Sequence, residues 1–223
     1  MQQPTTSPTR KTLLEQLAAD VDALPTDPYV RVGIDGVDGA GKSVLAGELT
    51  AALRARGRQV VHASVDGFHH PRALRHARGP ADPEGFYRAS HDLAAFRREL
   101  LGPFAPGGHG LHRTRVFDAR TDSPDLAQQA QAAPGTILLV DGIFLHRPEL
   151  HGCWSWSLWL QVERATTLQR CVERDGSGSA DLTAASNRRY VEGQQLYVHE
   201  ATPQERATHV VDNNDLAEPF LLR

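Results

Sequence analysis

The sequence predicts an α/β domain in which parallel strands alternate with helices. Residues 30–34 form a short β-branched run, which a glycine-rich turn joins to a segment with apolar residues at helical spacing over 43–56. Residues 136–142 form an almost continuously apolar run, as expected of a strand buried on both faces of a parallel sheet. The length of 223 residues suits one such domain with a small lid and leaves little room for a second full domain.

Composition along the chain predicts the domain boundaries. Residues 1–10 are polar and include two prolines, so we expect a disordered N-terminus there. Residues 11–223 are expected to form a single domain, with an insertion over about 67–124 and a lid over about 163–190. The segment 11–24 is amphipathic and predicts a helix that covers the sheet and ends before Pro25.

Overall composition favours small-molecule partners. The net charge of −3 and an isoelectric point near 6.4 argue against a sequence-independent nucleic-acid-binding protein, which needs a basic face. No apolar run is long enough to span a membrane, and the N-terminus lacks the apolar core of a secretory signal. Cys153 and Cys171 make no disulfide framework. We therefore expect a cytoplasmic protein that binds neither nucleic acid nor a membrane, and leave a homo-oligomer open.

The central motif is Gly36-Val37-Asp38-Gly39-Ala40-Gly41-Lys42-Ser43, which matches the P-loop or Walker A pattern G-x-x-x-x-G-K-[S/T]. Glycines let the loop backbone bring N–H groups close to a polyphosphate. Lys42 would reach the β- and γ-phosphates, and the Ser43 hydroxyl would ligate Mg²⁺. An ordinary glycine turn is the alternative, but the flanking strand and helix favour a nucleotide site. The predicted nucleotide-binding residues are Gly36, Asp38, Gly39, Ala40, Gly41, Lys42, Ser43 and Val44.

A second predicted strand, over 60–65, ends at Asp66. Ligands of open α/β sheets bind at the carboxyl ends of strands, so Asp66 is a candidate catalytic base or outer Mg²⁺ ligand. An Asp at this position could equally make only local turn hydrogen bonds. The adjacent His69 and His70 have no partner at metal-ligand spacing, so we expect a histidine here to contact substrate or phosphate rather than a dedicated metal ion.

The insertion could build an acceptor site or be an inert surface excursion. Ser90 is expected to cap a helix that runs to Leu101, followed by a short strand over 112–118 and a hairpin return over 119–124. The central strand after the insertion ends at Asp141, a carboxylate expected to hold Mg²⁺ or its water. Trp154 and Trp156 lie in a fourth strand and are expected to pack or to contact another copy.

The last third of the chain predicts a lid. A helix over 163–174 places Arg170 and Arg174 on one face, a flexible link follows over 175–179, and a second helix covers 182–197. Such arginines could close over phosphates, neutralise charge and exclude water, although a solvated helix face would also carry charges. A short final strand is expected over 209–212.

With these residues in place, the chain over about 30–212 resembles the uridine kinase family, which includes type I pantothenate kinase-like enzymes. The P-loop is generic, and other segments carry the more specific resemblance. These are Asp66-Gly67-Phe68-His69-His70-Pro71 (family D-x-F-Y or D-G-F-x-x-P), Ala81-Asp82-Pro83-Glu84-Gly85-Phe86 (F-D-H-P-x-A-F), Val116-Phe117-Asp118 (V-Y-D) and the lid helix with Arg170 and Arg174. The chain departs from uridine kinases at Asp141, where they usually carry Glu, and at Thr121-Asp122-Ser123-Pro124, where they carry H-S-R.

The resemblance implies a P-loop NTPase fold of three αβα layers, with a five-stranded parallel sheet, the carboxylate strand beside the P-loop strand and a small helical lid. It implies Asp66, Lys42, Arg170 and Arg174 as catalytic residues. Ser43, Asp141 and Asp66 are the expected metal site. The expected substrate contacts are Asp66, Phe68, His69, Asp82, Phe117 and Arg170.

The expected function is a kinase that moves the γ-phosphoryl group of ATP, with Mg²⁺, to a hydroxyl of a small metabolite. A nucleoside such as uridine or cytidine is the first acceptor to consider. The alternatives are pantothenate or a sugar as acceptor, or a regulatory P-loop NTPase that has no acceptor.

Overall fold

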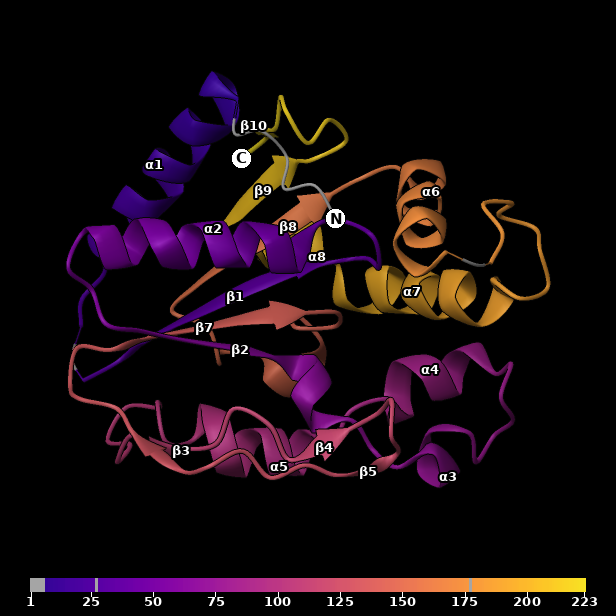
Figure 1. Ribbon diagram of the computed structural model, residues 1–223, viewed down its shortest axis with the longest axis horizontal. Coiled ribbons are helices and arrows are strands. Elements are labelled where there is room, and N and C mark those ends of the chain that lie inside the picture. The colour runs from indigo at the N-terminus through magenta and orange to yellow at the C-terminus, as the bar shows by residue number, and fades with distance from the viewer. Residues whose placement is uncertain (1–6, 27, 177) are drawn as a thin grey trace.

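Six strands form one sheet in the computed structural model, which describes residues 7–26, 28–176 and 178–223 (Figure 1). The strand order is β10-β9-β8-β1-β7-β2, and all neighbours are parallel except β10, which runs antiparallel to β9. The strands are β1 (Val30–Gly36), β2 (Val60–Ser64), β7 (Ile137–Gly142), β8 (Trp156–Gln161), β9 (His209–Asp212) and β10 (Phe220–Leu221). The predicted five-stranded parallel sheet is confirmed, as is the pairing of β7 with β1. The sequence analysis did not foresee the antiparallel edge strand β10.

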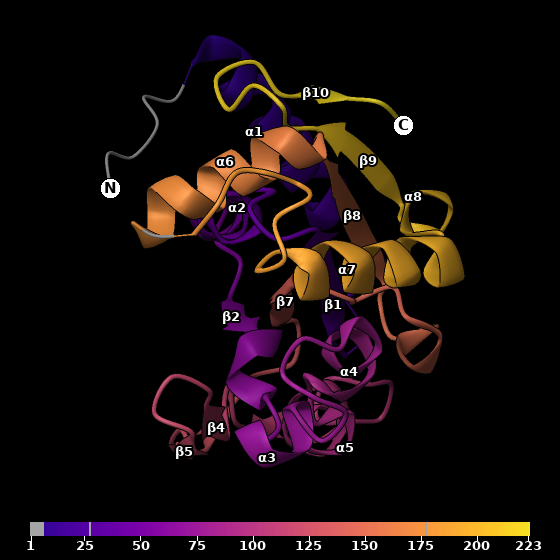
Figure 2. The ribbon, with the colours of Figure 1, turned by 90° about the vertical axis from the view of Figure 1, so that its right-hand side faces the viewer.

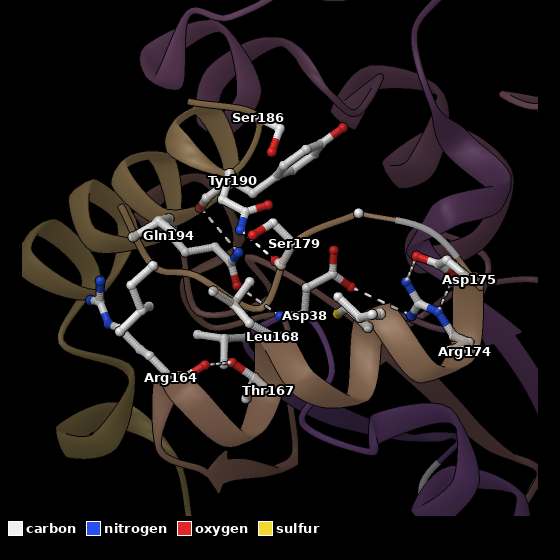
Figure 3. A pocket seen from close by; sticks show the side chains of 17 residues that line it. Asp38, Arg164, Thr167, Leu168, Arg174, Asp175, Ser179, Ser186, Tyr190 and Gln194 are labelled. Atoms are coloured by element: carbon white, nitrogen blue, oxygen red, sulfur yellow. Dashed lines mark hydrogen bonds and ion pairs between the residues drawn. The ribbon is translucent and has the colours of Figure 1, made fainter. Parts of the chain in front are cut away.

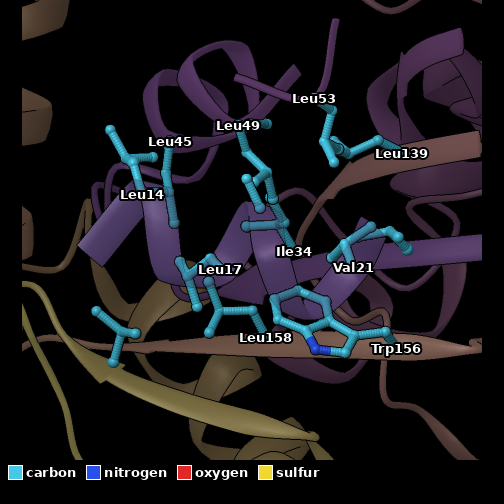
Figure 4. Packing of buried hydrophobic residues seen from close by; sticks show 14 of the residues in the cluster. Leu14, Leu17, Val21, Ile34, Leu45, Leu49, Leu53, Leu139, Trp156 and Leu158 are labelled. Carbon is cyan, nitrogen blue, oxygen red and sulfur yellow. The ribbon is translucent and has the colours of Figure 1, made fainter. Parts of the chain in front are cut away.

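Helices cover both faces of this sheet and complete the three layers. Side chains alternate along β7, so Ile137 and Leu139 join the core beneath α1 (Pro8–Asp22) and α2 (Lys42–Ala55) (Figure 4). Leu138 and Val140 pack on the opposite face against the insertion. Trp156 lies in the first core, and the ring of Trp154 packs over Gly33, so both tryptophans serve packing.

The N-terminal helix starts earlier than the sequence predicted. Ser7 caps α1 by accepting a hydrogen bond from the Arg10 N–H at 3.0 Å, and Pro8 occupies the first turn, where its missing N–H costs nothing. The predicted disordered segment 1–10 is therefore wrong for residues 8–10. Residues 1–6 lie outside the described residues.

The insertion contains short helices and two small antiparallel sheets of two strands each, β3 with β6 and β4 with β5. Its elements are η1 (Val65–Phe68), α3 (Arg72–Arg75), α4 (Pro83–Ala89), α5 (Leu93–Phe96), its continuation η2 (Arg97–Leu101), β3 (Leu111–His112), β4 (Phe117–Asp118), β5 (Ser123–Pro124) and β6 (Ala130–Gln131). The hairpin of β4 and β5 agrees with the expected return over 119–124. The prediction that Ser90 caps a helix is wrong. Asp92 caps α5 by accepting from the Ala95 N–H at 2.9 Å, and Ser90 follows α4.

The predicted lid region forms α6 (Arg164–Asp175) and α7 (Arg188–Ala201), with η3 (Pro148–Leu150) before them and α8 (Pro203–Arg206) after them. Helix α7 starts six residues later than predicted, because turns occupy 182–187. The expected flexible link over 175–179 includes residue 177, which lies outside the described residues. Figure 2 shows α7 between α6 and α4. In the parts of the chain described here, no helix has the length and apolarity needed to cross a membrane.

Candidate active site

The P-loop connects β1 to α2, and two of its glycines have the left-handed backbone conformation that glycine permits. Gly39 and Gly41 have φ angles of +75° and +93°, in the left-handed region that favours glycine. A Cβ atom on Gly39 would collide with the Thr167 carbonyl oxygen, and one on Gly41 would lie 2.8 Å from Asn213 Nδ2. Lys42 Nζ donates to the Val37 carbonyl at 2.8 Å, which holds the ammonium group across the loop. The predicted loop is therefore built as the sequence motif requires.

A buried hydrogen-bond network that the sequence did not reveal supports the start of this loop. The Asp35 carboxylate has no exposed surface and accepts from the Gly36 N–H at 2.7 Å, from His146 Nδ1 at 2.7 Å and from the Tyr197 hydroxyl. Burial raises the pKa of Tyr197 well above its ordinary value, and the negative charge of Asp35 raises it further. Tyr197 therefore stays protonated as a donor, and α7 is tied to the end of β1.

Two oxygen ligands predicted for Mg²⁺ come together at the start of α2. Ser43 Oγ donates to Asp141 Oδ2 at 2.6 Å, across the pairing of β1 with β7. The other oxygen of Asp141 lies 2.9 Å from His62 Nε2 on β2. Hydroxyl and carboxylate oxygens are the donors that Mg²⁺ prefers, so this pair fits the metal that accompanies nucleotides. His62 is a contact that the sequence analysis missed.

Asp66 lies in η1, directly after β2, with its carboxylate open to a large cavity. Desolvation by the surrounding chain would raise its pKa, but the attraction of His91, and of His69 and Lys42 after it, lowers the pKa to about 2. The side chain nevertheless keeps 68% of its surface exposed, because the cavity admits solvent on one side. Asp66 is therefore ionised at neutral pH and is accessible to a ligand.

This cavity has a volume of about 780 Å³ and brings together most of the predicted site. Its wall includes the predicted residues Asp38, Gly39, Gly41, Lys42, Ser43, Val44, Asp66, His69, Asp141, Arg170 and Arg174. They come from the P-loop, two strand ends and α6, which the sequence separates by more than a hundred positions. A polyphosphate on the P-loop and a small molecule beside Asp66 would thus share one space.

The two predicted lid arginines reach the cavity with different partners. Arg170 donates through Nη2 to the carbonyl oxygens of Asn213 and Asn214, at 3.1 and 2.7 Å. Arg174 pairs with Asp175 at 2.7 Å and lies 3.9 Å from Asp38 of the P-loop. Both guanidinium groups stand on α6 beside the phosphate loop.

Three predicted substrate contacts are absent from the described residues that line this cavity. Asp82 instead caps α4 by accepting from the Gly85 N–H at 2.5 Å, and it pairs with Arg78 at 3.1 Å. Phe68 is completely buried against Phe96, with ring centroids 5.1 Å apart, and Phe117 is buried in β4. An Asp before a Pro is a strong helix start, and the two phenylalanines gain more from the core than from the cavity wall.

The wall of the cavity also contains cationic and aromatic side chains on the side away from the P-loop. The sequence analysis did not name these residues as contacts of the acceptor. Arg189 is buried, donates to the Pro80 carbonyl at 2.7 Å, and lies over the Phe86 ring at 5.6 Å. Arg75 at the end of α3 and His76 directly after it extend this group. Burial lowers the pKa of His76, and the positive charges of Arg189 and Arg75 lower it further. No local sequence signal marks these residues, because α3 and α7 are far apart in the chain.

A second, smaller cavity of about 370 Å³ lies between α6 and α7 (Figure 3). It shares Asp38, Arg174 and Tyr190 with the first cavity. Its other lining residues include Leu168 of α6 and Gln194 of α7. The Asp38 N–H donates to Gln194 Oε1 at 2.7 Å, which is one of the dashed contacts in Figure 3. The P-loop is therefore in direct contact with α7 as well as with α6.

The P-loop after β1, with Ser43 against a carboxylate on the neighbouring strand, defines a P-loop NTPase fold. Solved structures narrow this class to the fold of small-molecule P-loop kinases. A possible uridine kinase from Bacillus stearothermophilus has a TM-score of 0.71 at 21% identity, over 90% of this chain and 97% of that chain. A candidate fructose transport system kinase from Silicibacter sp. TM1040 has a TM-score of 0.68 at 22% identity, over 84% and 95%.

Phosphoribulokinase from Rhodobacter spheroides is also similar, with a TM-score of 0.54 at 16% identity, over 84% of this chain and 71% of that chain. No protein-family model and no curated protein sequence matches the chain. At these identities the likeness establishes the fold. It agrees with the resemblance to uridine kinases that the sequence motifs indicated.

Proposed function

We propose that this protein is a kinase that transfers the γ-phosphoryl group of ATP, with Mg²⁺, to a hydroxyl group of a small metabolite. The observation that carries the proposal is a single cavity whose wall holds Lys42, the Ser43–Asp141 pair and Asp66. Phosphoryl transfer asks a protein mainly to position two substrates and to neutralise charge. This cavity has a candidate residue for each task.

The P-loop side of the cavity supplies the nucleotide contacts. Loop N–H groups and Lys42 would hold the phosphates, and Ser43 with Asp141 would hold Mg²⁺, which when bound neutralises charge on the phosphate oxygens. Arg170 and Arg174 stand beside the loop on α6 and would stabilise charge that develops during transfer. ATP rather than another nucleotide is proposed from the likeness to known kinases.

Asp66 would orient the acceptor and take its proton. With its pKa lowered to about 2, Asp66 is a carboxylate throughout the neutral range, so it can accept a hydrogen bond from an acceptor hydroxyl. As the hydroxyl oxygen bonds to phosphorus and the bond to the nucleotide's bridging oxygen breaks, the hydroxyl proton passes to the carboxylate. A weak base suffices, because phosphoryl transfer asks the protein mainly for positioning and for stabilisation of charge.

The acceptor side of the cavity favours a metabolite that carries a negative charge. Arg75 and Arg189 donate mainly to neutral carbonyl oxygens. The Asp122 carboxylate lies 3.4 Å from Arg75, so the positive charges of the two arginines are only partly balanced. A carboxylate or phosphate group on the acceptor would complete that balance. A sugar phosphate or a hydroxy acid such as pantothenate is therefore favoured over a neutral nucleoside, which the motif resemblance put first.

An acceptor panel tests this function. ADP release would be measured with Mg·ATP and nucleosides, neutral sugars, pantothenate, glycerate and sugar phosphates in turn, and products would be identified by mass spectrometry. We expect one charged acceptor to stimulate ADP release and to appear as its phosphate ester. Unstimulated hydrolysis with every acceptor, together with nucleotide-dependent binding of a protein partner, would instead support the regulatory NTPase.

A further inference from the structure

Three side chains with metal-binding atoms meet on the acceptor side of the cavity. Asp66 lies in η1, His69 directly follows η1, and His91 lies between α4 and α5. A carboxylate oxygen and one ring nitrogen from each histidine all lie within 4.8 Å of one another. Among the described residues, this is the one group of three acidic, histidine or cysteine side chains that meets this condition.

The backbone fixes the two histidines opposite each other. His69 and His91 face each other in an isolated antiparallel bridge, flanked by hydrogen bonds from the Asp92 N–H to the Phe68 carbonyl at 2.7 Å and from the His70 N–H to the Ser90 carbonyl at 2.9 Å. Their ring centroids are 4.6 Å apart. The site is therefore held by main-chain contacts between two segments and does not depend on chance side-chain positions.

Each histidine has a ring nitrogen that can serve as a metal ligand. His69 Nδ1 lies 2.8 Å from the Asp66 carbonyl oxygen, which can only accept, so the proton is on Nδ1 and Nε2 is free to bind a metal ion. His91 is only 2% exposed, and its Nε2 has no hydrogen-bond partner although it lies 3.6 Å from Asp66 Oδ1. A buried polar atom without a partner is costly, and a metal ion would satisfy it.

We propose that Asp66, His69 and His91 form a binding site for a zinc-class divalent cation, separate from the magnesium site of Ser43 and Asp141. Imidazole nitrogen suits Zn²⁺ and Co²⁺, whereas Mg²⁺ prefers oxygen donors. Bond lengths of about 2.0–2.1 Å place tetrahedral ligand atoms about 3.3 Å apart, close to the 3.6 Å between His91 Nε2 and Asp66 Oδ1. The cavity, which Asp66 and His69 line, leaves room for a water or acceptor oxygen as a fourth ligand.

Occupation of this site would stop the proposed reaction, and this consequence rests on the proposed function. A metal ion bound to the Asp66 carboxylate takes the oxygen that would accept the acceptor's proton and blocks the space of the acceptor hydroxyl. Zinc is therefore expected to inhibit in competition with the acceptor and not with the nucleotide.

The test uses the full chain after chelation, with Cys171→Ser as background to remove the half-buried thiol. Co²⁺ is titrated in the presence of Mg²⁺, and its visible absorption reports four-coordinate binding, which Zn²⁺ should then displace. We expect one Co²⁺ per chain, and at least a tenfold loss of affinity in His69→Ala, His91→Asn and Asp66→Asn. His70→Ala, which removes the neighbouring histidine, should leave the affinity unchanged.

The outcomes separate this inference from the proposed function. His91 is buried and its variant could misfold, so His69→Ala, at a half-buried position, decides the question on its own. Metal affinity that is equal in His69→Ala and His70→Ala overturns the metal site, whatever the kinase activity. Loss of metal binding in His69→Ala supports the metal site. If, in addition, no acceptor of the panel is phosphorylated, the metal site stands and the kinase proposal is overturned.

Discussion

Asp66 is the residue whose replacement should separate chemistry from nucleotide binding. Replacing its carboxylate by the isosteric amide in Asp66→Asn removes the proton acceptor but leaves the P-loop untouched. We expect kcat to fall by about 10²–10⁴-fold, the usual contribution of a general base. The affinity for Mg·ATP, measured by calorimetry, should stay within about twofold of wild type, because Lys42 and the Ser43–Asp141 pair are unchanged.

Asp118→Asn is the matched control for this variant. Asp118 is a carboxylate of the same insertion, in the β4–β5 hairpin, and is not among the residues that line the cavity. It should leave both turnover and nucleotide affinity unchanged. Turnover of Asp66→Asn at the wild-type rate would remove the proposed role of Asp66.

At the residue scale, the sequence predicted the side chains whose position follows from a local pattern. The motif itself identifies Lys42 and Ser43. Asp141 closes a short, almost continuously apolar run that favours a buried strand, so its place near a strand end was predictable. Asp82 was placed near the acceptor by resemblance alone; in the structure it caps α4 and is not among the residues that line the cavity. His91 could not be predicted, because only the folded insertion brings it to Asp66.

At the scale of elements, α7 depends on its link to β1 through Tyr197. Tyr197→Phe removes the hydroxyl that donates to the buried Asp35 carboxylate and leaves that charge with one donor fewer. We expect the free energy of unfolding, measured by urea titration, to fall by about 1–3 kcal/mol. Tyr190→Phe, in the same helix but 43% exposed, should change it by less than about 0.5 kcal/mol. Equal stability of the two variants would contradict the importance of this link.

The close packing of α7 on α4 gives a second test at this scale. A Cβ atom on Gly193 would lie 2.7 Å from the Pro83 carbonyl oxygen and 2.8 Å from the Phe86 ring, so Gly193→Ala should force the helices apart. We expect a loss of about 1–3 kcal/mol in unfolding free energy, and altered acceptor kinetics, since Phe86 lines the cavity.

Gly47→Ala is the control, because Gly47 lies in α2 and a Cβ atom there would meet no described atom within 4 Å beyond the backbone of its own helix. Alanine has the higher helix propensity, so this variant should gain about 0.5–1 kcal/mol. The same substitution in two helices would then have effects of opposite sign. A gain in both would mean that α4 and α7 are not closely packed at Gly193.

The sequence predicted the elements with a strong periodic pattern and missed those whose existence depends on partners. Strands β1, β2 and β7 are apolar runs between turn signals, and each was predicted within about three residues of its observed bounds. The fourth predicted strand corresponds to β8. The two-residue strand β10 has too few residues to show a pattern and exists because β9 offers an edge. The start of helix α7 was predicted too early, because the apolar residues near 182 have helical spacing. In the structure, turns occupy that segment.

At the scale of the whole molecule, contacts between distant segments hold the P-loop in place. Arg10 of α1 has no exposed surface, pairs with Glu48 of α2 at 2.7 Å, and donates to Asn213 Oδ1 at 3.3 Å. Asn213 in turn donates to the Ala40 carbonyl of the P-loop at 2.8 Å. No sequence pattern could foresee this connection, because its members are separated by up to 203 positions. It makes the loop's geometry a property of the complete fold, so ligand binding at the loop should stabilise the whole chain.

That stabilisation is measurable as a shift of the thermal midpoint. A ligand that binds only the folded state at about 100 times its Kd adds about 2.7 kcal/mol to the free energy of unfolding. For a chain of this size each kcal/mol raises the midpoint by about 2–4 °C, so Mg·ATP should raise it by about 5–11 °C. Lys42→Ala should abolish the shift, because the ammonium group that would hold the phosphates is gone. Lys11→Ala removes the other lysine of the chain, an exposed side chain on α1, and should keep the full shift. A shift of equal size in both lysine variants would mean that the nucleotide binds elsewhere, and the proposed P-loop site would have to be abandoned.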